Sequence, residues 1–105
     1  MQKNDNKLPL IREVVLKYLP NSRVILFGSR ASDKYDARSD YDVMAVTPYN
    51  LSIDDIKAIK PKIRRDLALF HIPIDIIIAT ESEVVKTSVL TNHIFNEALS
   101  TGIAI

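Results

Sequence analysis

The sequence predicts an α/β fold in which one mixed β-sheet is flanked by helices. Short apolar runs of strand length alternate along the chain with longer segments whose apolar residues recur at helical spacing. The chain has 105 residues, of which 47% are hydrophobic, and this size and composition suit one domain with one ordinary core. We therefore expect a single small domain over residues 1–105, and any active site of so small a domain should lie open on its surface.

The first half of the chain predicts one helix and two strands. Apolar residues recur on one helical face over residues 8–19, and Pro20 ends that segment. The apolar run 23–27 (RVILF) is closed by Gly28 and predicts a buried strand followed by a tight turn. Residues 40–46 (DYDVMAV) predict the second strand.

The second half is expected to contain, in order, a helix over 53–70, a strand over 73–79, a helix over 82–100 and a short edge strand at 103–105. Ser52 and Asp55 have the spacing of a capping box at the start of the first of these helices. Pro61 should kink or divide that helix, because proline removes a backbone hydrogen bond. Gly102 stands where a helix C-cap is expected.

Composition excludes several function classes. The chain has no cysteine, which excludes disulfides, thiolate metal sites and cysteine catalysis. The formal charge of +1 comes without a basic block, which argues against nucleic acid as a partner. The sequence has no apolar run near the roughly 20 residues that span a bilayer, so we expect a soluble cytoplasmic protein with no membrane contact.

The acidic residues suggest a metal site. Asp40 and Asp42 are two apart on an expected strand, so their side chains should point to the same face and reach one cation or a close pair. Asp75 interrupts an apolar strand, where an unpaired buried carboxylate would cost several kcal/mol, and a neighbouring position would give it the same metal. Mg²⁺ suits this set, because it binds through one or two carboxylates together with substrate phosphates.

The turn after the first strand supplies a phosphate site. Gly28 allows a ligand to approach the backbone closely, and Ser29 offers a hydroxyl and an amide at an expected helix start. A phosphate site beside a metal site suits in-line phosphoryl or nucleotidyl transfer.

These motifs resemble a known signature. Phe27-Gly28-Ser29, ten further residues, Asp40-Tyr41-Asp42-Val43 and the isolated Asp75 are similar to the pattern of the polymerase beta nucleotidyltransferase superfamily. By length the chain resembles its minimal nucleotidyltransferases, with a nucleotidyltransferase-like mixed sheet. The resemblance implies that Asp40, Asp42 and Asp75 bind two Mg²⁺ ions and carry catalysis, with Asp75 also as general base. It implies that Gly28, Ser29 and Arg30 bind the triphosphate.

One position departs from the family pattern. A second basic residue often follows the Gly-Ser turn, whereas here Ala31, Ser32 and Asp33 come after Arg30. Lys34 and Arg38 are the nearby cations that can compensate.

The resemblance implies transfer of a nucleoside monophosphate from a nucleoside triphosphate, with ATP favoured, to a hydroxyl acceptor. It also implies a partner: a helical HEPN-type protein of a toxin–antitoxin pair, or a second copy in a homodimer. The alternative is an antitoxin-like interaction subunit that binds nucleotide with little or no catalysis. A receiver-like phosphoacceptor domain is a third hypothesis, and it would need Lys86 near the acids.

Other polar and aromatic residues have ordinary interpretations. His71 and His93 have no metal-ligand spacing, and surface or capping roles are expected for both. Tyr41 should face away from the two acids beside it and pack in the core.

Overall fold

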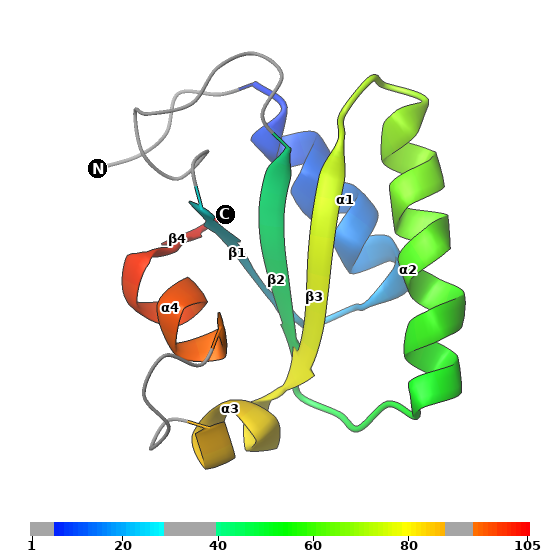
Figure 1. Cartoon of the computed structure of the whole chain (residues 1–105). Coiled ribbons are helices and arrows are strands. Elements are labelled where there is room, and N and C mark those ends of the chain that lie inside the picture. The colour runs from blue at the N-terminus through cyan, green and yellow to red at the C-terminus, as the bar shows by residue number, and fades with distance from the viewer. Residues whose placement is uncertain (1–5, 29–39, 88–93) are drawn as a thin grey trace.

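A computed structural model describes residues 6–28, 40–87 and 94–105 of the chain. The strands form a four-stranded sheet in the order β3-β2-β1-β4, in which β2 and β3 are parallel and the other pairs are antiparallel (Figure 1). This mixed sheet with flanking helices confirms the predicted α/β fold class. In chain order the elements are α1 (Leu8–Tyr18), β1 (Arg23–Phe27), β2 (Tyr41–Thr47), α2 (Ile53–Ala68), β3 (Ile74–Thr80), α3 (Glu81–Thr87), α4 (Ile94–Thr101) and β4 (Ile103–Ala104).

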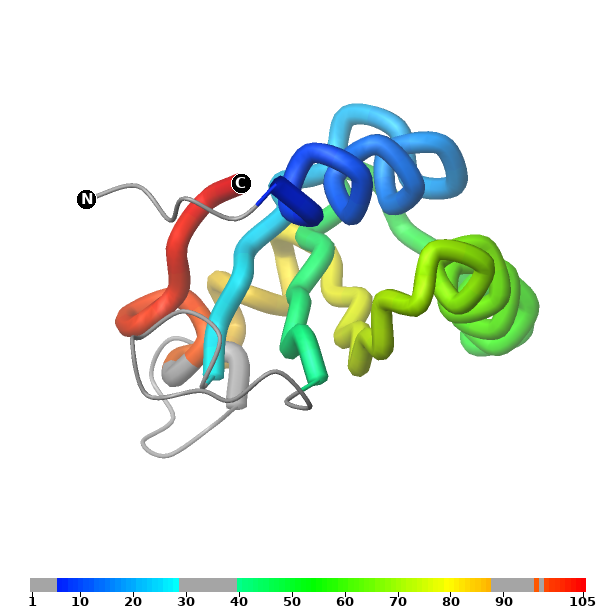
Figure 2. Tube along the Cα trace, turned by 90° about the horizontal axis from the view of Figure 1, so that it is seen from above, coloured from blue at the N-terminus to red at the C-terminus, as the bar shows by residue number. Residues whose placement is uncertain are grey.

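Both faces of the sheet are covered, which explains why its strands are almost continuously apolar. Figure 2 shows α1 over one side of the sheet and α2 beside its β3 edge, and residues of both helices belong to one core, while Ala98 of α4 belongs to the other core. Successive strand residues therefore enter two different cores. The core under α1 and α2 includes Leu8, Ile11, Val15, Leu26, Tyr41, Val43, Ile63, Leu67, Ile74 and Ile76. The core under α3 and α4 includes Ile25, Phe27, Met44, Val46, Ala79, Val84 and Ala98.

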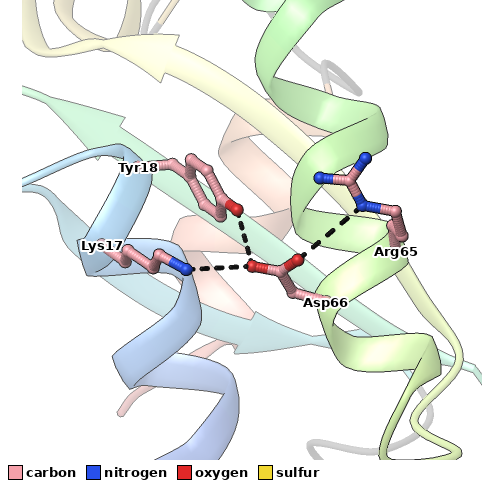
Figure 3. A network of polar contacts seen from close by, with 4 residues as sticks. All are labelled: Lys17, Tyr18, Arg65 and Asp66. Carbon is pink, nitrogen blue, oxygen red and sulfur yellow. Dashed lines mark hydrogen bonds and ion pairs between the residues drawn. The ribbon is translucent and has the colours of Figure 1, made fainter.

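A polar network joins α1 to α2 beside the first core (Figure 3). The Tyr18 hydroxyl donates a 2.6 Å hydrogen bond to Asp66 Oδ2, and Lys17 Nζ lies 3.4 Å from the same oxygen. Arg65 Nε lies 3.9 Å from Asp66 Oδ1. The hydrogen bond from Tyr18, helped by these two cations and opposed by desolvation, lowers the pKa of Asp66 below its ordinary value. The network holds the Asp66 side of α2 against α1. The Arg64 side of the helix is therefore turned toward β3 at the edge of the sheet.

Helix α2 has the predicted start, and Pro61 does not divide it. The Ser52 side chain accepts a hydrogen bond from the Asp55 backbone, and the Asp55 side chain accepts one from the Ser52 backbone, which confirms the capping box. The helix continues through Pro61 to Ala68. Pro61 is exposed, so water can solvate the carbonyl of Lys57 that loses its helical partner. Burial of Ile63 and Leu67 holds the helix on the sheet, at about 1.5–3 kcal/mol for each such side chain.

The prediction of one helix over 82–100 is wrong, because the described residues form two helices, α3 and α4, and Asn96 of α4 donates a 3.0 Å hydrogen bond to the Thr87 carbonyl at the end of α3, which one straight helix does not allow. Residues 88–93 lie outside the described residues. The sequence SVLTNH between them is rich in residues of weak helix propensity, which helical periodicity alone does not register. The end of α4 agrees with the prediction, since Gly102 follows its last residue and its amide donates to the Ala98 carbonyl at 2.9 Å. The expected edge strand is β4, which pairs with β1. No helix in the described part of the chain is long and apolar enough to cross a membrane.

Candidate active site

The parts of the predicted motif meet at one end of the sheet because of strand direction. β1 and β2 are antiparallel, so the end of β1 lies beside the start of β2, and Phe27 pairs with Asp42. β2 and β3 are parallel, so their starts lie side by side, and Asp42 pairs with Asp75. Gly28 directly follows Phe27. Gly28, Asp42 and Asp75 therefore belong to one end of the sheet, opposite the end at which α3 follows β3 (Figure 1).

Asp42 and Asp75 lie on the same face of the sheet. Each stands between two residues of the core under α1 and α2, so the alternation of side chains places both acids on the opposite face, which carries α3 and α4. Neighbouring strands are about 4.8 Å apart, so the two carboxylates are direct neighbours. Two carboxylates at this separation repel each other unless a cation neutralises them, as a metal ion would.

Gly28 fits this end of the sheet for two reasons. Its φ of 71° lies in the left-handed region that glycine adopts without steric cost. A Cβ atom at this position would also overlap with Oδ2 of Asp42. The Asp42 carboxylate thus lies directly over the Gly28 backbone. A phosphate that binds to the Gly28 turn would therefore lie next to this carboxylate.

Asp75 is not buried, which corrects the reasoning that first singled it out. Its side chain is 66% exposed, so the cost of burying an unpaired carboxylate does not arise. Arg64 of α2 places its Nη2 atom 3.7 Å from Asp75 Oδ1, and the Arg64 side chain is 49% exposed. Both groups are open to solvent, as expected for a site on the surface of a small domain. Sequence reasoning did not identify Arg64, although its place in the cationic run KAIKPKIRR was a signal.

Asp40 lies just before β2 and is exposed to solvent. Within residues 6–28, 40–87 and 94–105, no three His, Cys, Asp or Glu side chains gather closely enough to hold a metal ion. The paired acids are Asp42 and Asp75, and Mg²⁺ needs no more than two protein carboxylates when phosphates and waters complete its shell. The donor set at this end of the sheet thus fits a metal that arrives with a phosphate ligand.

A family comparison decides what kind of domain this is. A family model described as a nucleotidyltransferase domain matches residues 8–99. The chain belongs to this nucleotidyltransferase family. The matched region spans the chain from α1 into α4, and it includes all the motif residues predicted above.

A structural comparison agrees with this assignment at the level of the fold. A crystal structure of a candidate nucleotidyltransferase from Sulfolobus solfataricus superposes with a TM-score of 0.58 at 22% sequence identity. The similarity covers 90% of this chain and 72% of that one. No curated protein matches the sequence significantly.

Part of the predicted phosphate site of this nucleotidyltransferase domain lies outside the described residues. Ser29, Arg30, Lys34 and Arg38 lie outside the described residues, as does His93. Their roles at the site stay predictions from the sequence.

Tyr41 and His71 have the ordinary roles predicted for them. Tyr41 is 1% exposed and belongs to the core under α1 and α2, on the face opposite Asp42. His71 is exposed in the turn before β3, where it adopts a positive φ of 59°. Neither residue adds a ligand to the site.

A cavity of about 370 Å³ lies away from the acids of the nucleotidyltransferase domain. It is bounded by α1, the start of β1 and the end of the chain, and its lining includes Arg12, Ser22, Leu99 and Ile105. The acids lie at the opposite end of β1, next to Phe27. We therefore do not assign this cavity to the nucleotide.

Proposed function

We propose that this nucleotidyltransferase domain transfers a nucleoside monophosphate from a magnesium nucleoside triphosphate to a hydroxyl acceptor. The register that makes Asp42 and Asp75 direct neighbours beside Gly28 is the observation that carries the proposal. It joins two metal-binding carboxylates to a backbone turn at which a phosphate can approach closely. ATP is the favoured donor on the family resemblance alone.

The roles of the residues follow from their positions. The Gly28 turn, continued by Ser29 and Arg30, would bind the triphosphate. Asp42 and Asp75 would hold Mg²⁺, which when bound would neutralise charge on the phosphates. A role for Asp40 as a further metal ligand and the number of two ions rest on the family resemblance alone. Asp75 is open to solvent, so it can also accept the proton of an acceptor hydroxyl without a change of the fold.

The acceptor hydroxyl would belong to a partner protein. Asp40 and Asp75 are exposed at this end of the sheet, so that a second molecule can approach them. We propose a helical HEPN-type partner in a cytoplasmic toxin–antitoxin pair, a role that rests on the family resemblance, with a homodimer as the other arrangement.

One observation supports a second function. In the described part of the chain the acids do not form a ready three-carboxylate metal site. An antitoxin-like subunit that binds nucleotide weakly and acts through its partner would need no such site.

The substitution Asp42→Asn tests the proposed function. Because Asp42 lies both over Gly28 and beside Asp75, its neutralisation should weaken magnesium-dependent nucleotide binding by about tenfold or more, which is roughly 1.4 kcal/mol. Titration calorimetry with ATP and Mg²⁺ measures this, and Asp54→Asn, an exposed acid at the start of α2, is the matched control.

Transfer itself is measured with labelled nucleotides, in the presence of a candidate partner protein. Label appearing on that protein with wild type, and not with Asp42→Asn, supports the enzyme. Equal nucleotide affinity in wild type and Asp42→Asn would contradict the shared site. Binding that depends on Asp42 without any label transfer would favour the interaction subunit.

A further inference from the structure

Helix α2 carries a line of cations beside the candidate active site. From Lys57 to Arg65 the sequence KAIKPKIRR contains five cations and no acid. Residues three and four apart on a helix are neighbours, so Lys57, Lys60 and Arg64 lie on one side of α2. We call these three residues the cationic line, and it spans about 10 Å along the helix axis.

Two contacts fix where this line faces. Asp66 bonds to Tyr18 on α1, whereas Arg64 lies 3.7 Å from Asp75 on β3. The cationic line therefore follows the side of α2 next to β3, and it ends at the candidate active site. Lys62, two residues from both Lys60 and Arg64, points to the opposite side of the helix.

The described part of the fold leaves two of the three cations of this line without an ion pair. Among the described residues neither Lys57 nor Lys60 has an ion pair, and the pair of Arg64 with Asp75 is open to solvent. Like charges three and four residues apart on a helix repel each other. Solvent-facing cations are common on helices, but a line of them ending at an active site is the complement of an acidic surface.

We propose that the cationic line is a docking surface for a helical segment of a partner protein that carries acidic side chains on one face. Acids spaced three and four residues apart on a helix have the same spacing as Lys57, Lys60 and Arg64, so two such helices can align opposite charges. Ile53, four residues before Lys57, is 72% exposed and extends the line by an apolar contact.

The observations favour protein over nucleic acid as the occupant. A phosphate backbone makes no apolar contact with the exposed Ile53. The chain as a whole also has a net charge of only +1. The proposal does not depend on nucleotidyl transfer, since a catalytic enzyme and an interaction subunit can both dock through this surface. Docking would compete with Asp75 for Arg64 and so act on the site directly.

A nuclear magnetic resonance titration tests the proposal with a defined probe. The probe is an alanine-based helical peptide of about 20 residues, with three glutamates spaced three and four residues apart and a leucine one turn further on. The control peptide has the same composition with its glutamates distributed around the helix. At about 50 mM salt, the first peptide should shift amide signals along Ile53, Lys57, Lys60 and Arg64, and it should bind more tightly than the control.

Two matched variants locate the binding. Lys57→Glu with Lys60→Glu should weaken the affinity about fivefold or more, whereas Lys62→Glu on the opposite side should leave it within about twofold. Melting curves check folding, and Lys57→Gln with Lys60→Gln replaces the reversal if it unfolds the domain. Equal loss in the Lys62→Glu variant, no shifts along the line, or tighter binding of single-stranded oligouridylate than of the peptide would each overturn the proposal.

Discussion

Replacing Asp75 by asparagine removes one carboxylate of the candidate site and keeps the shape of the side chain. The structural cost follows from the contact with Arg64, in which the charged atoms are 3.7 Å apart and the side chains are 49% and 66% exposed. In water this separation corresponds to about 1 kcal/mol of attraction, and exposed pairs of this kind contribute about 0–1 kcal/mol. The melting temperature of Asp75→Asn should therefore fall by no more than about 4–8 °C.

The Asp75→Asn substitution should lower the rate of nucleotidyl transfer much more than it lowers the stability of the fold. If Asp75 is the general base, single-turnover transfer should slow by about 10² to 10⁴, while nucleotide affinity stays within a few fold because Asp42 and the Gly28 turn remain. Melting curves, ATP titration and single-turnover transfer on this one variant separate the two costs. Preserved transfer together with a large fall in melting temperature would remove Asp75 from catalysis and favour the interaction subunit.

Two further substitutions test the site and the support beneath it. Gly28→Ala should destabilise the fold by about 1–2 kcal/mol, because φ is 71°, and should also weaken nucleotide binding by displacing Asp42, as measured by urea unfolding and ATP titration. Gly102→Ala, whose Cβ would overlap with Ala98 and Ile25, should destabilise without loss of nucleotide affinity, and equal loss in both variants would contradict the role of Gly28. Tyr18→Phe should lower the melting temperature at neutral pH. The pKa of Asp66 is lowered in the folded state. The stabilisation that the Tyr18–Asp66 hydrogen bond provides is therefore complete above the ordinary pKa of about 3.8, and it is lost as the pH falls through the lowered value. A difference between wild type and Tyr18→Phe that persists unchanged at acidic pH would contradict this origin.

The sequence predicted the strands well because their signals are local. The run RVILF matches β1 at both ends, and β2 and β3 each begin one residue later than expected. Apolar runs bounded by turn residues define such strands without knowledge of their neighbours. The start of α2 was predicted from a local signal too, namely the capping-box spacing of Ser52 and Asp55.

The errors came from properties that depend on packing and solvent. Pro61 does not divide α2, because its exposed position lets water satisfy the freed carbonyl and because Ile63 and Leu67 hold the helix on the sheet. Helical periodicity did not predict the division into α3 and α4, because the sequence keeps an apolar helical spacing from Val85 to Leu99.

The candidate site shows the same limit. The motif spacing indicated Asp42 and Asp75 as neighbours, and the register of β2 and β3 agrees. The sequence could not show that Asp75 is exposed or that Arg64 of α2 lies beside it. Both depend on β3 lying at one edge of the sheet, where a side chain can meet solvent and the neighbouring helix together.

Neither the position of Asp75 nor its contacts make a carboxylate necessary for folding. Its side chain is largely exposed, and its ion pair with Arg64 is weak. Gly28 differs, since its backbone conformation and the space over it both enter the stability of the fold. A loss of activity in Asp75→Asn therefore indicates a role of Asp75 in the reaction. The same loss in Gly28→Ala indicates a role in the reaction only after the change in stability has been measured and subtracted.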